Sequence, residues 1–524
     1  MEFFLNIEGY LQGKNKKDLE KIRLLVNHSK IDMRNFGMVT IDLKNFSWME
    51  VDSPIVDNNF WWQLQGYIFF TYFSNSHSLL NKVEKKIFFD FFLCVLKNWK
   101  KKCFDSDSGK LLWHDHATGL RTLRLAKFYI IGKTSDFLSK DDENDLEGLI
   151  LKHLEILSDN SFYSENTNHG FDQSVSAYAT CLLLSDNSSL NSGLASIFSN
   201  RIVKELDFAF TDEGVHVENS PSYQNYMLGK EKVLDRLVMI GDKSIQSYKT
   251  KVFGKAKKFL EAITKLDGLL PTIGDTDAKD AGIKWLGDGV VHHDYSRSGY
   301  YIYKRKKEES VYLAIKNCHH SKYHRHDDNG SFYLEIQGVV VFGDGGLGYY
   351  KEKNPLRKFL RSVYAHNVVF SKNGKIYRDP KKLPLDARPR MSVFKNEVIC
   401  DFSDSEGKFQ RVFDLNDIDG NKLTIVDSWD SGREVSCNFF IPHENVISVE
   451  ANFNGFSFFN CGVGVRVSVF GGSFELFSSD KFGASLDDDL DACFSPSYSV
   501  FEPCQNVVVS NDRTSNSMVY VLEW

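Results

Sequence analysis

The spacing of hydrophobic residues divides this chain into two halves with different periods. Up to about residue 265, apolar residues recur every three or four positions, as they do along one face of an amphipathic helix. Short polar loops separate most of these segments, so we expect successive helical hairpins with their apolar faces buried in an (α/α) toroid. At least eight such segments are present, and six of them are 58–73, 85–99, 117–132, 146–157, 171–184 and 226–241.

The second half has the alternating pattern of β-strands. From about Ser298 onward, apolar and polar residues alternate, and turn-forming sequences such as DGN, NGK and GGS lie between the runs. This pattern predicts a large antiparallel β-sandwich. We therefore expect an α+β multidomain protein with a helical toroid over 1–265, a linker over 266–297 and a sandwich over 298–524. The predicted strands include 300–305, 310–316, 331–336, 339–342, 366–370, 422–427, 437–441, 465–470 and 518–524.

The composition is that of a globular protein with an excess of aromatic residues. The chain has 524 residues, of which 42% are hydrophobic, 26% charged and 14% aromatic. Aromatic side chains fill cores, and they also line clefts in which sugar rings stack. The net charge of −6 argues against nucleic-acid binding, although a local basic cleft could still hold an anionic substrate. The nine cysteines form no CxxC pair, so neither a disulfide framework nor a cysteine zinc site is expected.

We expect no secretory signal at the amino terminus, because no basic stretch precedes a long apolar run. The most apolar segment, 67–73, is far too short to cross a bilayer. We expect no membrane insertion and a cytoplasmic location for the sequence as it stands. The location would be periplasmic or extracellular if an export signal had been removed. The oligomeric state is left open.

Four clusters of polar residues carry side chains that could do chemistry. Three fall at predicted helix starts or loops of the first half, where toroids gather their binding residues. The fourth is a dense His/Asp loop of the second half, and a cleft between two domains is a usual place for a ligand. The clusters are Trp113, His114, Asp115, His116 and Arg121; Asn168 and His169; His216, Glu218, Tyr223 and Tyr226; and His324, His326, Asp327, Asp328, Asp344, His366 and Asn367.

Each cluster also has a purely structural interpretation when it is taken alone. Asn168 and Asp115 could be helix N-caps. Tyr223 and Tyr226, three residues apart, could pack on one helical face. We interpret His216 and Glu218 as structural residues, and Asp172 as a solvated one.

The motifs, taken in order, resemble those of the heparinase II/III superfamily of polysaccharide lyases, which includes oligoalginate lyases of similar build. The order is WHDHATGLR, NHG, ENSPSYQNY, LPTIGDTD, HRHDD followed by GDGG and YY, and AHNVVF. The resemblance extends from about residue 60 to residue 370. It departs from the family pattern at GDGG, where Asp-Pro-Gly is common, and at the additional aspartate of HRHDD.

The resemblance implies cleavage beside a uronic acid by β-elimination, which yields an unsaturated uronide. Asn168, helped by His169, would neutralise the uronate carboxylate, since stabilising the developing charge is the main electrostatic requirement. Tyr223 would be base, acid or both, with His324 as its partner and Tyr349 as a further catalytic candidate. Substrate would be bound by Arg121, His116, Trp113 and Tyr226, although Arg121 could equally be a buried structural ion-pair residue.

The resemblance also implies a zinc site in the second half. Its ligands, carried over by position, are His326, Asp344 and His366, and two histidines with one aspartate suit Zn²⁺. The metal would have a structural role, orienting the loop so that His324 faces the cleft. The alternative is a hydrogen-bonded His/Asp network without metal. Asp327 and Asp328 would then support the ligands or be solvated.

Two other functions compete with the lyase. A toroid-type glycoside hydrolase needs a pair of carboxylates, for which Glu218 and Asp275 are weak candidates. A glycan-binding protein without activity could keep the same scaffold. The expected partner is an anionic polysaccharide or oligosaccharide: a heparan-type glycosaminoglycan, hyaluronan or chondroitin, alginate, or a bacterial surface glycan.

Overall fold

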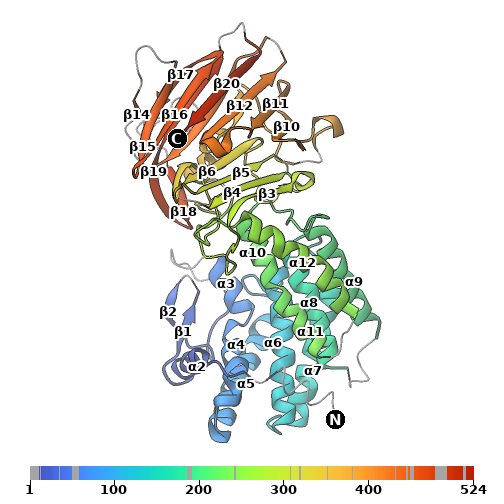
Figure 1. Cartoon of the computed structure of the whole chain (residues 1–524). Helices are drawn as coiled ribbons and strands as arrows, with labels where there is room; N and C mark the ends of the chain where they lie inside the picture. Colours follow the sequence, from blue (N-terminus) through green and yellow to red (C-terminus); the bar gives the residue numbers. More distant parts are fainter. Residues whose placement is uncertain are drawn as a thin grey trace. The chain divides into compact units, whose positions relative to one another are not determined.

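The chain forms two compact units in this computed structural model (Figure 1). The first unit comprises residues 1–209 and 231–250, and the second comprises 210–230 and 251–524. The residues that the structure describes are 11, 13–34, 36–49, 58–185, 192–240, 244–306, 309–317, 320–350, 352–379, 382–430, 432–443, 447–448, 454–477, 493–511 and 515–524.

The first unit is helical apart from one hairpin of β1 (Lys30–Met33) and β2 (Gly37–Thr40). Side chains on nearly all faces of the central helices α6 and α8 are buried, because α6 packs on α7 and α8, and α8 packs on α9. The helices are α2 (Lys16–His28), α3 (Asn58–Gln65), α4 (Ile68–Ser76), α5 (Lys82–Trp99), α6 (Asp115–Thr134), α7 (Lys140–Ser158), α8 (Asn168–Leu183), α9 (Ser192–Ala209) and α11 (Glu231–Met239). Helix α12 (Ser244–Ile263) follows, and a π-helical segment (Lys100–Phe104) extends α5.

The second unit begins with a short helix, α10 (Pro221–Gly229), and continues into antiparallel sheets. Pro221 occupies the first turn of α10, where its fixed φ and missing N–H are tolerated. One five-stranded sheet runs in the order β3 (Gly289–Tyr295), β4 (Tyr300–Lys306), β5 (Val311–Lys316), β6 (Ser331–Ile336) and β7 (Val339–Phe342). Helix α13 (Pro355–Leu360) lies in the connection after this sheet.

Two further sheets complete the second unit. The larger has the order β14 (Ile447–Ser448), β15 (Gly455–Asn460), β16 (Val463–Phe470), β20 (Ser517–Glu523), β12 (Lys422–Trp429), β11 (Lys408–Asp414), β10 (Glu397–Ser403) and β9 (Arg390–Phe394). The other has the order β17 (Gly472–Phe477), β19 (Val500–Asn511), β13 (Val435–Pro442) and β8 (Val369–Ser371), with β18 (Cys493–Ser497) also paired to β19.

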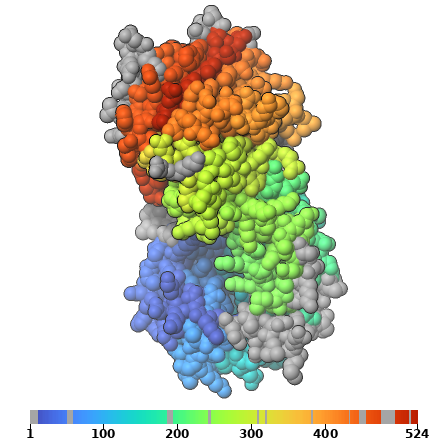
Figure 2. Space-filling model, viewed as in Figure 1, coloured from blue at the N-terminus to red at the C-terminus, as the bar shows by residue number. Residues whose placement is uncertain are grey.

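One large cluster of buried hydrophobic residues joins these sheets into a sandwich. The inward positions of β5, β6, β12, β13 and β16 contribute to one buried cluster, as the alternating sequence predicts. In the space-filling view the atoms coloured orange to red belong to the later strands of this sandwich (Figure 2). The predicted class, a helical toroid followed by an antiparallel sandwich, is confirmed.

Strand pairing begins earlier than the sequence predicted. Strand β3 lies within the stretch 266–297 that we expected to be a linker. It is an edge strand whose side chains are only partly buried, so its sequence, GVVHHDY, carries little alternation. Among the described residues, no helix combines the length and apolar character needed to cross a bilayer.

Candidate active site

The rings of Tyr223 and His324 stack on each other in the second unit. Their centroids lie 3.7 Å apart and their planes differ by 26°. Tyr223 is presented by the first turn of α10, and His324 by the loop between β5 and β6. His324 has a φ of +53°, a left-handed conformation that is uncommon for a residue other than glycine and often marks functional sites. The structure thus brings together two residues that are about 100 positions apart in the sequence.

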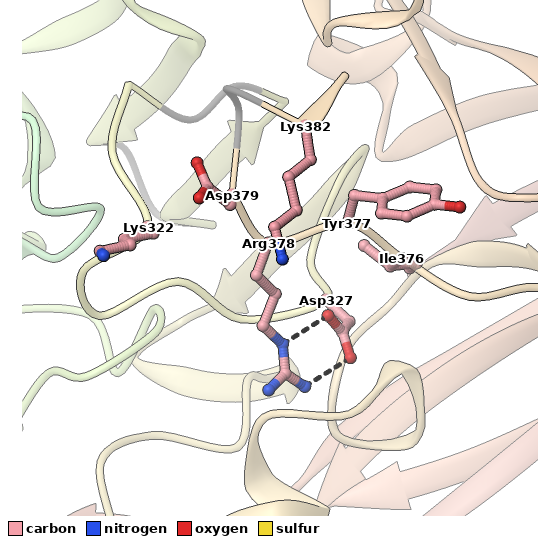
Figure 3. Close-up of a pocket in the computed structure, with 7 residues that line it drawn as sticks. All are labelled: Lys322, Asp327, Ile376, Tyr377, Arg378, Asp379 and Lys382. Atoms are coloured by element: carbon pink, nitrogen blue, oxygen red, sulfur yellow. Dashed lines mark hydrogen bonds and ion pairs between the residues drawn. The ribbon is translucent and has the colours of Figure 1, made fainter.

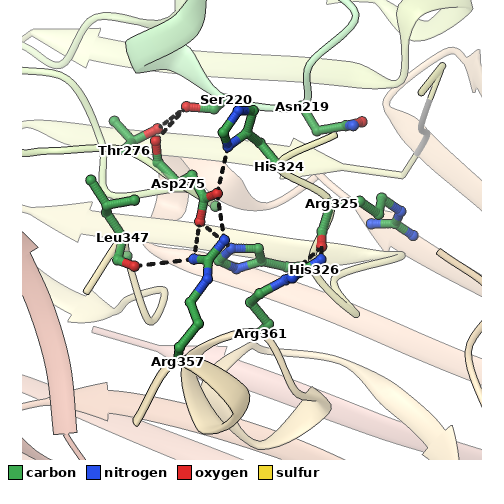
Figure 4. Close-up of polar contacts among 12 residues, drawn as sticks. Asn219, Ser220, Asp275, Thr276, His324, Arg325, His326, Leu347, Arg357 and Arg361 are labelled. Carbon is green, nitrogen blue, oxygen red and sulfur yellow. Dashed lines mark hydrogen bonds and ion pairs between the residues drawn. The ribbon is translucent and has the colours of Figure 1, made fainter. Parts of the chain in front are cut away.

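A buried carboxylate, Asp275, holds His324 in place (Figure 4). Asp275 Oδ2 is 2.7 Å from Nδ1 of His324, and Oδ1 is 2.6 Å from Nε2 of His326. Both oxygens also accept hydrogen bonds from the guanidinium of Arg357, at 2.7 Å for the Nη2–Oδ2 pair. Burial alone would raise the pKa of Asp275, but His326, Arg357 and His324 together lower it well below the usual range. Asp275 is therefore an ionised acceptor, a role that the sequence did not assign to it.

The tautomer of His324 follows from this contact. An ionised carboxylate only accepts hydrogen bonds, so Nδ1 of His324 carries a hydrogen. Nε2 is the nitrogen left to act on a ligand, and Oε2 of Glu218 lies 3.8 Å from it. Glu218, which we interpreted as structural, thus borders the reactive side of His324. His216 keeps a structural role, since it is buried, its ring accepts from the Glu218 N–H, and burial lowers its pKa to about 3.

The hydroxyl of Tyr223 donates a hydrogen bond to the hydroxyl of Tyr350 over 3.3 Å. The sequence nominated Tyr349 instead, but the ring of Tyr349 packs on Phe501 and Tyr498. The two tyrosines are adjacent in the chain, and motif order does not reveal which of them contacts Tyr223. Burial raises the pKa of Tyr223, and the neighbouring Tyr350, Glu218 and Asp275 raise it further, so Tyr223 is held as a neutral phenol.

His326, Asp344 and His366 converge at a second buried site. One potential ligand atom from each lies within 4.8 Å of the others. Nε2 of His326 faces Asp275, and Nδ1 of His366 lies 2.9 Å from Oδ2 of Asp344. These contacts leave the opposite ring nitrogens, Nδ1 of His326 and Nε2 of His366, buried and without a hydrogen-bond partner among the described residues. Two buried nitrogen lone pairs beside a carboxylate fit a metal ion such as Zn²⁺.

Buried ionic and amide contacts fix the loops that carry these residues. Asp328 is fully buried between Lys316 and Arg325, so it is not solvated. The amide of Asn367 donates to the carbonyls of Phe332 and Gly343 and accepts from Phe440 N–H at 2.7 Å.

Arg411 adds a further connection between the same loops. Its guanidinium pairs with buried Asp427 and donates to the carbonyls of Gly330 and Asn367. Gly330 follows the HRHDD loop, and Asn367 follows His366. Arg411 therefore joins the two loops that carry the candidate metal ligands, through hydrogen bonds to their backbones.

Asn168 and His169 open α8 in the first unit. The N-cap of this helix is Thr167, whose hydroxyl accepts from Gly170 N–H at 3.1 Å, so Asn168 is not the cap that we considered. Its side chain is partly exposed in the first turn. The Nδ1 atom of His169 lies 3.0 Å from Oδ2 of Asp115, an oxygen that also accepts from the Ser164 hydroxyl at 2.5 Å. Asp115 thus orients His169, while His114 occupies the N-cap position of α6.

His116 completes this polar group from α6. Its ring stacks on that of His169 with centroids 4.5 Å apart, and its Nε2 is 3.0 Å from Oδ2 of Asp172. Asp172 is buried and hydrogen-bonded, which corrects our interpretation of it as solvated. The chain therefore holds two Asp–His pairs back to back at the starts of α6 and α8.

The remaining predicted substrate-binding residues occupy different environments. Arg121 is fully buried and donates to His153 and to the carbonyls of Gln65 and Leu112. These contacts favour a structural role over substrate binding. The partners are neutral groups, whereas we had considered an ion pair. Trp113 is partly exposed, and its ring lies beside the Arg121 guanidinium. Tyr226 is exposed on α10, and its ring contacts the Lys230 ammonium.

Helix α9 supports the loop that precedes Asn168. Arg201 donates to the carbonyls of Leu157 and Ser158 at 2.6 and 2.8 Å. Glu205 accepts from the Tyr163 hydroxyl and from Asn166 N–H. Burial raises the pKa of Glu205 to about 7, and these hydrogen bonds only partly oppose the rise.

Comparison with known proteins identifies the architecture. Residues 290–452 match the family model described as Heparinase II/III-like, C-terminal. A heparinase III with methylated lysines is 15% identical, with a TM-score of 0.72 over 98% of this chain and 84% of that chain. A heparan sulfate lyase HepC mutant from Pedobacter heparinus is 13% identical, with a TM-score of 0.71 over 98% and 84%. Another heparinase III is 13% identical, with a TM-score of 0.72 over 98% and 85%. No curated protein matches the sequence.

The matching domain and the shared fold give this chain the architecture of a polysaccharide lyase. More narrowly, residues 290–452 are heparinase II/III-like, and the resemblance drawn from the motifs is confirmed.

Proposed function

We propose that this protein cleaves a uronic-acid-containing glycan by β-elimination and leaves an unsaturated uronide. The observation that supports this most directly is the Tyr223–His324 stack, in which Asp275 orients the imidazole. A phenol and an oriented imidazole supply the proton donor and acceptor that the reaction needs. A retaining or inverting hydrolase would instead place two carboxylates across the scissile bond.

The reaction transfers one proton from carbon and one to oxygen. The C5–H bond breaks, its electron pair forms the C4–C5 double bond, and the C4–O bond breaks in turn. We assign proton removal to Nε2 of His324, because Nδ1 of the same ring is bound to Asp275. We assign protonation of the leaving oxygen to Tyr223, since its raised pKa keeps the phenol protonated. Asp275 is a positioning residue in this scheme.

The substrate carboxylate must be neutralised, because the C5 proton is barely acidic beside a negative charge. Asn168 and His169 are the proposed donors. Asn168 lies in the first turn of α8, where the helix dipole favours an anion. The hydrogen bond between Nδ1 of His169 and the carboxylate of Asp115 leaves Nε2 of the ring to face a ligand.

We propose Zn²⁺ at His326, Asp344 and His366. The support is the pair of buried, unpartnered ring nitrogens and the Asp275 contact that fixes the tautomer of His326. Bound zinc would supply a structural cross-link between the HRHDD loop and the segment of His366. Asp275 contacts both His326 and His324. A metal ion that fixed His326 would therefore also help to fix the orientation of the His324 imidazole, which takes the proton.

For the substrate we propose a glycosaminoglycan. The support is the likeness to the structure of a heparan sulfate lyase, together with the matching family domain. Alginate and bacterial surface uronides are the alternatives that the assay below separates.

The test is the ultraviolet absorbance of unsaturated uronides during incubation with heparan sulfate, chondroitin, hyaluronan and alginate. Tyr223→Phe and His324→Ala should each reduce the rate about 100- to 10,000-fold. A synthetic uronide with an aryloxide leaving group at C4 needs no acid, so Tyr223→Phe should recover most of its activity on it while His324→Ala should not. Reducing ends released without absorbance would indicate a hydrolase. Full activity in both variants would refute the proposal.

A further inference from the structure

A separate cavity lies beside the HRHDD loop (Figure 3). Its volume is about 520 Å³, which falls within the range of small-ligand sites. Two segments of the second unit form it: the loop between β5 and β6, and the chain that follows β8. The lining residues are Lys322, Asp327, Ile376, Tyr377, Arg378, Asp379 and Lys382.

One wall of the cavity is a fixed ion pair. Arg378 donates from Nε and Nη2 to the two oxygens of Asp327, at 2.8 and 2.6 Å, and both bonds are visible in Figure 3. Nη2 also donates to the carbonyl of Arg361 at 3.1 Å. Arg378 and Asp327 therefore largely satisfy each other and hold the two segments together, which corrects the expectation that Asp327 supports the metal ligands or is solvated.

The charged groups that line the cavity are three cations, Lys322, Lys382 and Arg378, and two carboxylates, Asp327 and Asp379, so its net charge is positive. Lys322 and Lys382 are both exposed, and neither ammonium forms an ion pair with a carboxylate within the described part of the chain. In Figure 3 the Lys382 side chain extends toward the Arg378–Asp327 pair. Since the whole chain carries a net charge of −6, this attraction for anions is local.

An aromatic ring completes the lining. Tyr377 is 41% exposed, which is high for a large aromatic side chain. Aromatic rings stack on the apolar faces of pyranoses, and a hydroxyl at the rim can bond to sugar hydroxyls. Unpaired cations beside an exposed ring match a sugar that bears an acidic group.

We propose that this cavity is a subsite for a sugar unit carrying a carboxylate or a sulfate, with Lys322 and Lys382 binding the anion and Tyr377 stacking on the ring. The inference rests on the proposed lyase function, because Lys322 is two residues from His324 and the bound unit would belong to the same glycan chain. The subsite would raise affinity and select for acidic units near the one that is cleaved.

Calorimetric titration tests the subsite in the Tyr223→Phe background, in which the glycan should persist. The probes are heparan sulfate octasaccharides, alginate octamers and neutral dextran. Replacing Lys322→Gln and Lys382→Gln together should weaken binding of an acidic oligosaccharide roughly tenfold. The loss should shrink at high salt, because salt screens the attraction and lowers the free energy gained when counterions are released. A matched double variant, Lys395→Gln with Lys422→Gln, removes the same charge elsewhere and should bind normally.

Tyr377→Ala should weaken the same oligosaccharide severalfold without changing the salt dependence. With Tyr223 intact, the double lysine variant should raise KM and leave kcat unchanged. Equal affinity in the lysine and control variants, or no binding of either acidic probe, would overturn the subsite. A Tyr223→Phe protein that still forms unsaturated product would instead reject the proposed chemistry, whatever the titrations show.

Discussion

Arg357 binds both oxygens of Asp275 and so joins α13 to the segment LPTIGDTD. Both side chains are almost completely buried. The same arginine donates to the carbonyl of Leu347 at 3.1 Å, which anchors the glycine-rich turn after β7. A single buried ion pair thus joins three separate segments around His324 and His326.

Asp275→Asn should be among the most damaging substitutions in the second unit. The change removes the buried carboxylate that pairs with Arg357 and leaves only the exposed Glu352, 3.6 Å away. Breaking a buried ion pair typically reduces the free energy of unfolding by about 3–5 kcal/mol. His324 also loses the acceptor that fixes its tautomer, so kcat should fall further than stability explains. Urea unfolding and steady-state kinetics at a temperature where the variant stays folded would check both effects. Asp280→Asn, at an exposed position, should change neither quantity.

Removing one candidate metal ligand should abolish stabilisation by zinc. Zn²⁺ at about 100 times its dissociation constant should stabilise the wild-type protein by about 2.7 kcal/mol, because only the folded chain presents the site. His366→Gln should lose this response and the bound zinc measured by mass spectrometry. His28→Gln, an exposed histidine of α2, is the control. A wild-type protein whose melting temperature ignores both zinc and chelator would contradict the site.

Asp115→Asn should impair catalysis with little effect on folding. The amide can still bond to Ser164, but it no longer fixes the ring of His169 by charge. We expect kcat to fall about 10- to 100-fold. Asp136→Asn is the matched control, since Asp136 is exposed and its positive φ suits asparagine. Comparable kcat values for the two variants would remove Asp115 from the proposed scheme.

Glu205 should make the stability of the helical unit depend on pH. Its pKa is about 7 in the folded chain and about 4.5 when unfolded, so the folded state binds more protons between these values. The contribution is fully present below about pH 4.5 and is lost as the pH rises through 7. The loss should be roughly 1–3 kcal/mol. Glu205→Gln should flatten this part of the curve in urea unfolding at several pH values, whereas Glu155→Gln, an exposed change, should not.

The sequence predicted the features that depend on the spacing of apolar residues and on the order of motifs. Two periods separated helices from strands, and ordered motifs selected Tyr223, His324 and the three potential metal ligands, which the structure places in two adjoining groups. Asp275 was missed because its partners come from residues 324, 326 and 357, and such long-range pairing has no local signal. The sequence left a substrate role and a buried structural role open for Arg121, because its burial depends on neighbours from α3 and α7.

The second unit is built from two separate stretches of the chain, and this limits where the protein can be cut. Tyr223 precedes the change of period by many residues, yet α10 belongs to the same compact unit as His324. A fragment that starts where the strands start would therefore contain the imidazole of His324 but lack both Tyr223 and Asp275. Any truncation, chimera or domain exchange intended to preserve the chemistry must carry residues 210–230 along with the sandwich.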